Sequence, residues 1–62
     1  MKVKIKSFNG ELPSYLTVGK VYETSSFKEY CAVIEDDNGV DIFTYMNSSK
    51  HLNGGSWEII NE

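Results

Sequence analysis

The N-terminal segment of the chain alternates between charged and apolar side chains. Lys2, Lys4 and Lys6 fall on one face of an extended segment, and Val3 and Ile5 fall on the other. A period of two predicts a half-buried β-strand whose lysines lie in water. Lysines on an outer strand also discourage pairing between the edges of two sheets. We favour this structural role for the lysines over a phosphate-binding role.

A loop follows this strand. Pro13 cannot donate a ladder hydrogen bond, so residues 8–19 are not expected to join the middle of a sheet. Three apolar side chains of the loop are expected to tuck beneath the sheet, namely Tyr15, Leu16 and Val18. The loop is therefore expected to contribute to the core without forming a strand.

A second strand is predicted over residues 20–24. Gly19 permits the sharp turn before it, because glycine adopts a positive φ without steric cost. The segment itself is rich in β-branched and aromatic residues, which favour strands. Ser25 and Ser26 are expected to end it.

Two structures compete for the next segment. Ser26 and Glu29 match a capping box, and the apolar positions that follow would share one face of a helix over residues 27–34. The apolar run 30–34 also leads directly into a turn signal, which predicts a hairpin. Because a hairpin needs two arms and residues 40–46 have the composition of a strand, we favour the strand and keep the helix as the alternative.

The turn at Asp37-Asn38-Gly39 sets the register of this hairpin. A type I turn followed by a glycine bulge places Ile34 opposite Ile42 and Val33 opposite Phe43. A two-residue Asn38-Gly39 turn instead places Ile34 opposite Phe43 and turns one arm over. We favour the first register, and the second stays open.

Both registers leave the hairpin apolar on both faces. In the first, one face holds Tyr30, Ala32, Ile34, Val40, Ile42 and Met46. The other face holds Cys31, Val33, Phe43 and Tyr45. A domain of this size buries only one of these faces completely, so either the 8–19 loop or a partner molecule is expected to cover the second. Two copies meeting at the second face would form a symmetric dimer.

The C-terminal part adds a turn and a final strand. Residues 47–56 are polar and contain glycines, and one helical turn is expected over residues 47–52. Residues 56–60 then predict a closing strand. The whole chain is therefore predicted to be an all-β protein with five short strands and a short helical turn before the last strand.

Length and composition narrow the class of protein. Sixty-two residues allow one domain, which we assign to residues 1–62. A hydrophobic share of 40% is too high for a disordered chain, and the apolar runs are too short to span a membrane. A net charge of −3 without arginine argues against nucleic-acid binding. The single cysteine and the absence of an N-terminal signal-peptide run predict a complete small protein that stays in the cytoplasm.

The chain carries no recognisable catalytic or cofactor signal. Cys31 and His51 are the sole thiol–imidazole candidates, and the apolar neighbours of Cys31 favour a packing role. One cysteine and one histidine cannot supply a zinc site. The acidic cluster near the turn does not match a calcium loop. We expect no enzyme activity, no metal and no cofactor.

Three segments resemble a known family. Leu16-Thr17-Val18-Gly19-Lys20-Val21-Tyr22-Glu23, Val33-Ile34-Glu35-Asp36-Asp37-Asn38-Gly39 and Trp57-Glu58-Ile59-Ile60 are similar to the small SH3-like-barrel proteins of bacteriophages and prophages. The resemblance covers most of the chain and implies a five-stranded SH3-like barrel of viral origin. Members of the family are mostly uncharacterised. The chain departs from it over residues 44–56, and it lacks the motifs with which eukaryotic SH3 domains bind proline-rich peptides.

These observations favour a phage-encoded, non-enzymatic module that binds a host or phage protein, with inhibition of a host defence or housekeeping protein as the preferred role. The candidate partner-binding residues are Val33, Asp36, Asp37, Asp41, Phe43 and Tyr45. The alternative is a nucleic-acid-binding small β-barrel that uses Lys2, Lys4 and Lys6 near exposed aromatic rings. A mimic of DNA that uses the acidic ridge of Glu35, Asp36, Asp37 and Asp41 is weaker, because six lysines dilute the negative field.

Overall fold

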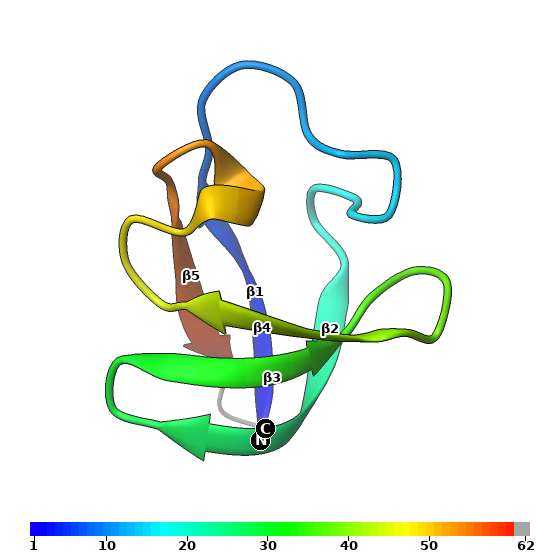
Figure 1. The fold of residues 1–62 in the computed structure, drawn as a ribbon, viewed down its shortest axis with the longest axis vertical. Helices are drawn as coiled ribbons and strands as arrows, with labels where there is room; N and C mark the ends of the chain where they lie inside the picture. Colours follow the sequence, from blue (N-terminus) through cyan, green and yellow to red (C-terminus); the bar gives the residue numbers. More distant parts are fainter. Residues whose placement is uncertain (61–62) are drawn as a thin grey trace.

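The structure is a computed structural model that describes residues 1–60. Its elements are β1 (Lys2–Ser7), β2 (Val21–Lys28), β3 (Cys31–Glu35), β4 (Asp41–Tyr45), the 3-10 turn η1 (Lys50–Leu52) and β5 (Ser56–Ile60). The strands form one antiparallel sheet in the order β4-β3-β2-β1-β5 (Figure 1). The sheet curls until the Trp57 N–H of β5 donates to the Met46 carbonyl just beyond β4, at 2.8 Å. This strand order, with a 3-10 turn before the last strand, is that of an SH3-like barrel, as expected.

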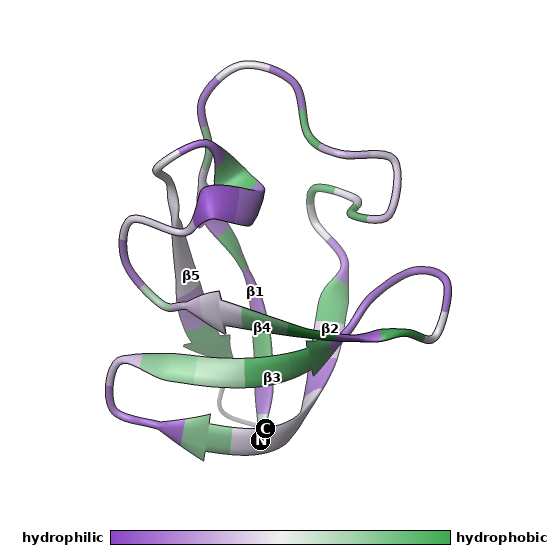
Figure 2. Ribbon diagram, viewed as in Figure 1, coloured by the Kyte–Doolittle hydropathy of each residue, from purple (hydrophilic) through white to green (hydrophobic). Residues whose placement is uncertain are grey.

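The core lies inside the curled sheet. Hydrophobic residues recur along the strands, which alternate between inward and outward positions (Figure 2). The buried hydrophobic residues come from β1, β2, β3 and β5, the first loop, the position after β4, and η1; they are Val3, Ile5, Leu16, Tyr22, Ala32, Ile34, Met46, Leu52 and Trp57. Leu12, Tyr15, Phe27 and Ile42 pack against them. The alternation predicted from the sequence thus places one face of each strand in the core.

The hairpin of β3 and β4 adopts the first of the two predicted registers. Ile34 lies opposite Ile42, and Val33 lies opposite Phe43. Gly39 has a φ of 76°, as the glycine bulge after a type I turn requires. The alternative register, which required a two-residue Asn38-Gly39 turn, is therefore wrong.

The structure corrects one predicted strand end and excludes the helix alternative. β2 does not end at Ser25 and Ser26 but continues to Lys28, with an irregularity in its pairing between Thr24 and Ser26. The helix alternative over residues 27–34 does not form, because β2 and β3 pair through this segment and Phe27 packs against the core. A β-bulge absorbs the extra residue without ending the strand.

Three apolar residues are more exposed than predicted, because they lie in turns or directly after one. Tyr30 occupies the turn between β2 and β3 and is 69% exposed. Val40 follows the β3–β4 turn, and Val18 lies at the tip of a turn closed by the Lys20 N–H and the Thr17 carbonyl. Both side chains are more than half exposed.

Candidate docking surface on β2, β3 and β4

Three neighbouring strands present their outward side chains as rows across the sheet. The pairing registers place Ser26, Val33 and Phe43 in one row. The next row toward the β2–β3 turn consists of Lys28, Cys31 and Tyr45. Toward the opposite end lie Glu35 and Asp41, which face each other across β3 and β4. We call these eight residues the outer face.

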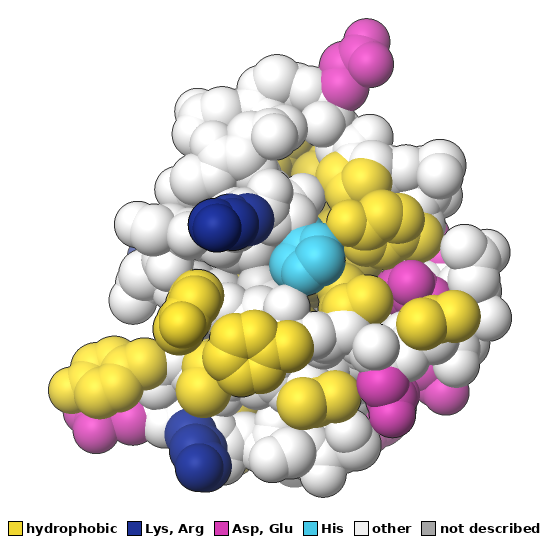
Figure 3. All heavy atoms as spheres, viewed as in Figure 1, with side chains coloured by type: hydrophobic (Ala, Val, Ile, Leu, Met, Phe, Trp, Pro, Cys, Tyr) yellow, Lys and Arg dark blue, Asp and Glu magenta, His cyan; other side chains and the backbone are white. Residues whose placement is uncertain are grey.

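Aromatic rings dominate the outer face. Phe43 is 54% exposed and Tyr45 is 53% exposed. Their rings meet edge to face with centroids 5.3 Å apart. Hydrophobic side chains gather over β3 and β4 in the view of Figure 3. The alternation of β4 predicted that both residues share this face and left open whether the first loop covers it. Two adjacent, rigidly held aromatic rings form a suitable contact surface for a partner.

The first loop leaves these rings uncovered. Its buried side chain, Leu16, belongs to the core, and Tyr15 packs against the same cluster. The Tyr15 hydroxyl then meets Nδ1 of His51, at 2.8 Å. The loop therefore covers the end of the barrel near η1, and Phe43 and Tyr45 stay exposed together.

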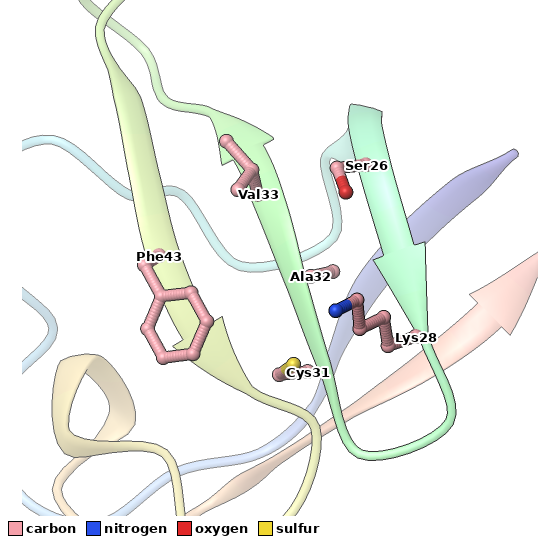
Figure 4. Close-up of a pocket in the computed structure, with 6 residues that line it drawn as sticks. All are labelled: Ser26, Lys28, Cys31, Ala32, Val33 and Phe43. Atoms are coloured by element: carbon pink, nitrogen blue, oxygen red, sulfur yellow. The ribbon is translucent and has the colours of Figure 1, made fainter.

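A pocket of about 220 Å³ opens within the outer face. It is lined by Ser26, Lys28, Cys31, Ala32, Val33 and Phe43, which Figure 4 shows around β3. The hollow forms because the small Ser26 and Cys31 side chains stand in the same rows as larger neighbours. Its volume suits one side chain of a partner rather than a whole cofactor, which needs about 300 Å³ or more.

His51 joins η1 to the edge of β4. Its Nε2 lies 2.9 Å from the Phe43 carbonyl oxygen, which can only accept, so Nε2 is the donor. In the neutral ring Nδ1 then accepts from the Tyr15 hydroxyl. Both ring nitrogens are thus engaged, and neither is bonded to the Cys31 thiol. Sequence reasoning missed this link, because its members lie far apart along the chain.

The predicted acidic ridge is only partly solvent-facing. Asp36 is buried, and its Oδ1 accepts hydrogen bonds from the backbone N–H groups of Asn38 and Val40, at 2.8 Å and 3.0 Å. This is the pattern by which an aspartate stabilises a turn. Glu35 and Asp41 are exposed. The continuous ridge expected from the sequence is therefore corrected to one exposed pair.

Asp37 joins the hairpin to the first loop. Its carboxylate accepts hydrogen bonds from the Thr17 hydroxyl and the Lys20 amine, each at 2.7 Å, and from the Tyr22 hydroxyl at 2.9 Å. The hydrogen bonds from Lys20 and then Thr17 lower the pKa of Asp37 below its usual value of 3.8. Burial, above all, raises the pKa of Tyr22. The Asp37 carboxylate thus links the β3–β4 turn to the first loop and to Tyr22 of β2.

The Asp37→Asn substitution is expected to lower stability at neutral pH and to flatten its dependence on pH. A carboxyl group whose pKa is lower in the folded state stabilises the fold above its unfolded pKa, and this contribution is lost as pH falls through the folded pKa. The urea midpoints of the parent and the variant should therefore differ at pH 7 and begin to converge only when the pH falls below about 3.8. Asp41→Asn, at an exposed site, is the matched control. A difference that stays constant down to pH 2 would contradict this role.

Two of the three β1 lysines, Lys2 and Lys4, lie apart from the Phe43 and Tyr45 rings. Lys2 and Lys4 belong to β1, which β2 and β3 separate from β4. Their amines lie 3.5 Å from carboxylate oxygens of Glu23 and Glu58, respectively. Lys2 and Lys4 therefore do not lie beside Phe43 and Tyr45, and Lys6 is left with the exposed Phe8 as the aromatic ring nearest to it in sequence.

Among residues 1–60, no group of three or more His, Cys, Asp or Glu side chains is arranged to hold a metal ion. The same part of the chain contains no helix of the length and apolarity needed to cross a membrane.

Comparison of the chain with protein-family models, with curated proteins and with solved structures finds no match. The likeness to phage proteins thus remains a prediction from the sequence.

Proposed function

We propose that the protein is a small non-enzymatic binding module, encoded by a phage or prophage, that docks on a host or phage protein in the bacterial cytoplasm. The observation that carries the proposal is the pair of half-exposed aromatic rings, Phe43 and Tyr45, on a sheet face that the first loop leaves open. Inhibition of a host defence or housekeeping protein is the role we favour. The resemblance of the sequence supports the viral origin.

The outer face has the anatomy of a binding surface. Aromatic residues are enriched at protein interfaces, and a few of them supply most of the binding energy. Here the rings stand on paired strands, so little conformational freedom is lost when a partner binds. The pocket beside Phe43 adds a recess that can receive one side chain of the partner. The candidate set is accordingly centred on Val33, Phe43 and Tyr45, with Asp41 at its margin.

Affinity purification from bacteria that express the tagged protein tests the proposal. The parent is expected to retain a stoichiometric partner, and Tyr45→Lys is expected to reduce that retention at least about tenfold, as loss of an aromatic anchor does. Val18→Lys is the matched control, because Val18 is equally exposed but lies in the first loop. Retention of the partner by Tyr45→Lys at the parental level would exclude the outer face. Absence of any stoichiometric partner from the parent counts against the binding role.

A further inference from the structure

The charges of the outer face are separated along the strands. Lys28 stands at one end, in the row with Cys31 and Tyr45. Glu35 and Asp41 stand at the other end, about 13 Å away at the usual rise of a strand. The row between them holds Ser26, Val33 and Phe43. The face therefore has an apolar centre with a positive end and a negative end.

Neither end forms an ion pair among the described residues 1–60. Glu35 and Asp41 are exposed and directly opposite, and like charges in that position destabilise a sheet. Neither acid forms an ion pair with a residue in the described range 1–60. Lys28 likewise has no ion pair there, whereas Lys20 does, and Figure 4 shows the Lys28 amine turned over the pocket. Lys20, whose amine is paired with Asp37, is the cation that acts on Glu35 from within the chain. Direct ion-pair partners for Lys28, Glu35 and Asp41 are thus left to a second molecule.

Such a face is complementary to itself. An interface between identical subunits related by a two-fold axis uses the same patch on both, so opposite charges at its two ends can satisfy each other. With the axis across the strands, the positive end of one copy meets the negative end of the other. With the axis along the strands, like charges meet, which is unfavourable. The charges select the first arrangement.

We infer that two copies of the protein associate through the outer face, with Val33 and Phe43 near the two-fold axis and Lys28 of each copy near Glu35 of the other. This inference rests on the proposed role of the outer face as a docking surface. Because one face serves both contacts, the dimer and the complex with another protein exclude each other. Dimer formation then limits the amount of protein that is free to bind a partner.

The dimer is expected to be weak. A standard stable interface takes about 800 Å² from each partner, which is about one fifth of the 3997 Å² surface of this chain. Eight residues on one side are also fewer than the roughly 20–30 of such an interface. A dissociation constant between about 10 μM and 1 mM is therefore expected.

Sedimentation equilibrium between about 10 μM and 2 mM, the range set by that affinity, tests the dimer. The average mass of the parent should rise from that of a monomer toward that of a dimer. Lys28→Glu should weaken association at least about tenfold, because both contacts of the symmetric pair become repulsive. Lys6→Glu is the matched control, because Lys6 is exposed on β1, away from the outer face. Thermal midpoints establish that each variant is folded.

A mixture of two charge-reversed variants tests the arrangement of the dimer most specifically. Glu35→Lys alone should also weaken association. When it is mixed with Lys28→Glu, opposite charges meet at both ends again, and a mixed dimer of near-parental affinity should form. A parent that stays monomeric to 2 mM overturns the dimer, while docking on another protein is judged separately by Tyr45→Lys. A Lys28→Glu variant that behaves like Lys6→Glu, or variants that do not combine, overturns the arrangement.

Discussion

Replacing Gly55 with alanine is expected to lower the free energy of unfolding by more than about 3 kcal/mol, or to prevent folding. Gly55 is buried where the segment after η1 crosses the end of β1. A Cβ atom at this position would overlap the carbonyl oxygen of Ser7 and would lie 2.6 Å from its carbonyl carbon and 2.7 Å from Cα of Phe8. These are backbone atoms, which cannot turn aside as a flexible side chain can.

The backbone around Gly55 cannot shift without breaking hydrogen bonds. Its N–H donates to the Leu52 carbonyl at 3.1 Å, and its carbonyl accepts from the Ser49 N–H at 2.8 Å. Gly19→Ala is the control, because Gly19 has a φ of 84° but no atom within 4 Å of the added Cβ. That variant should lose only about 1–2 kcal/mol from backbone strain. Equal losses in the two variants, measured by chemical denaturation, would contradict the close approach of the two backbones.

Thr44→Val is expected to cost about 2–4 kcal/mol, although it preserves the shape of the side chain. The Thr44 hydroxyl lies 2.6 Å from the Ser49 hydroxyl and accepts from Nε1 of Trp57 at 3.1 Å. All three residues are buried. Removing the shared hydroxyl leaves the polar groups of Ser49 and Trp57 without this partner, and a buried polar group without a partner is costly.

Thr24→Val is the matched control for this network. The Thr24 hydroxyl also makes a hydrogen bond, to the Met1 carbonyl at 2.8 Å, but it lies near solvent. Water can replace that bond, so a loss of about 1 kcal/mol or less is expected. Guanidinium denaturation of both variants measures the difference. A Thr44→Val variant no less stable than Thr24→Val would show that the network does not hold β4, η1 and β5 together.

Local patterns account for most of the fold. The alternation in β3 and β4 and the turn ending at Gly39 were enough to predict the hairpin, to favour the register that forms and to place Phe43 and Tyr45 on one face. Whether the first loop covers that face was left open, and the structure shows both rings half exposed. The end of β2 was missed, because Ser25 and Ser26 resemble a turn and the pairing with β3 that extends the strand is not visible in the segment itself. Tertiary pairing overrides such local preferences.

The details of the site depend on contacts between distant segments. The pocket requires the register of β2 against β3, which sets Ser26 beside Val33. The link from Tyr15 to His51 spans 36 positions of the chain, and no spacing rule predicts it. Asp37 was assigned to the hairpin turn and the acidic ridge, yet the fold of the first loop brings Lys20 to its carboxylate. Such contacts follow from the folded barrel rather than from any one segment.

The free energy of unfolding of Tyr45→Lys, measured beside the parent and Val18→Lys, tests most directly whether the outer face is a docking surface. A docking surface tolerates the lysine, so the variant should lie within about 1 kcal/mol of the parent while it loses the partner. A loss of more than about 3 kcal/mol, the size expected when a core aromatic is removed, would contradict this and assign Tyr45 and its neighbours to the core.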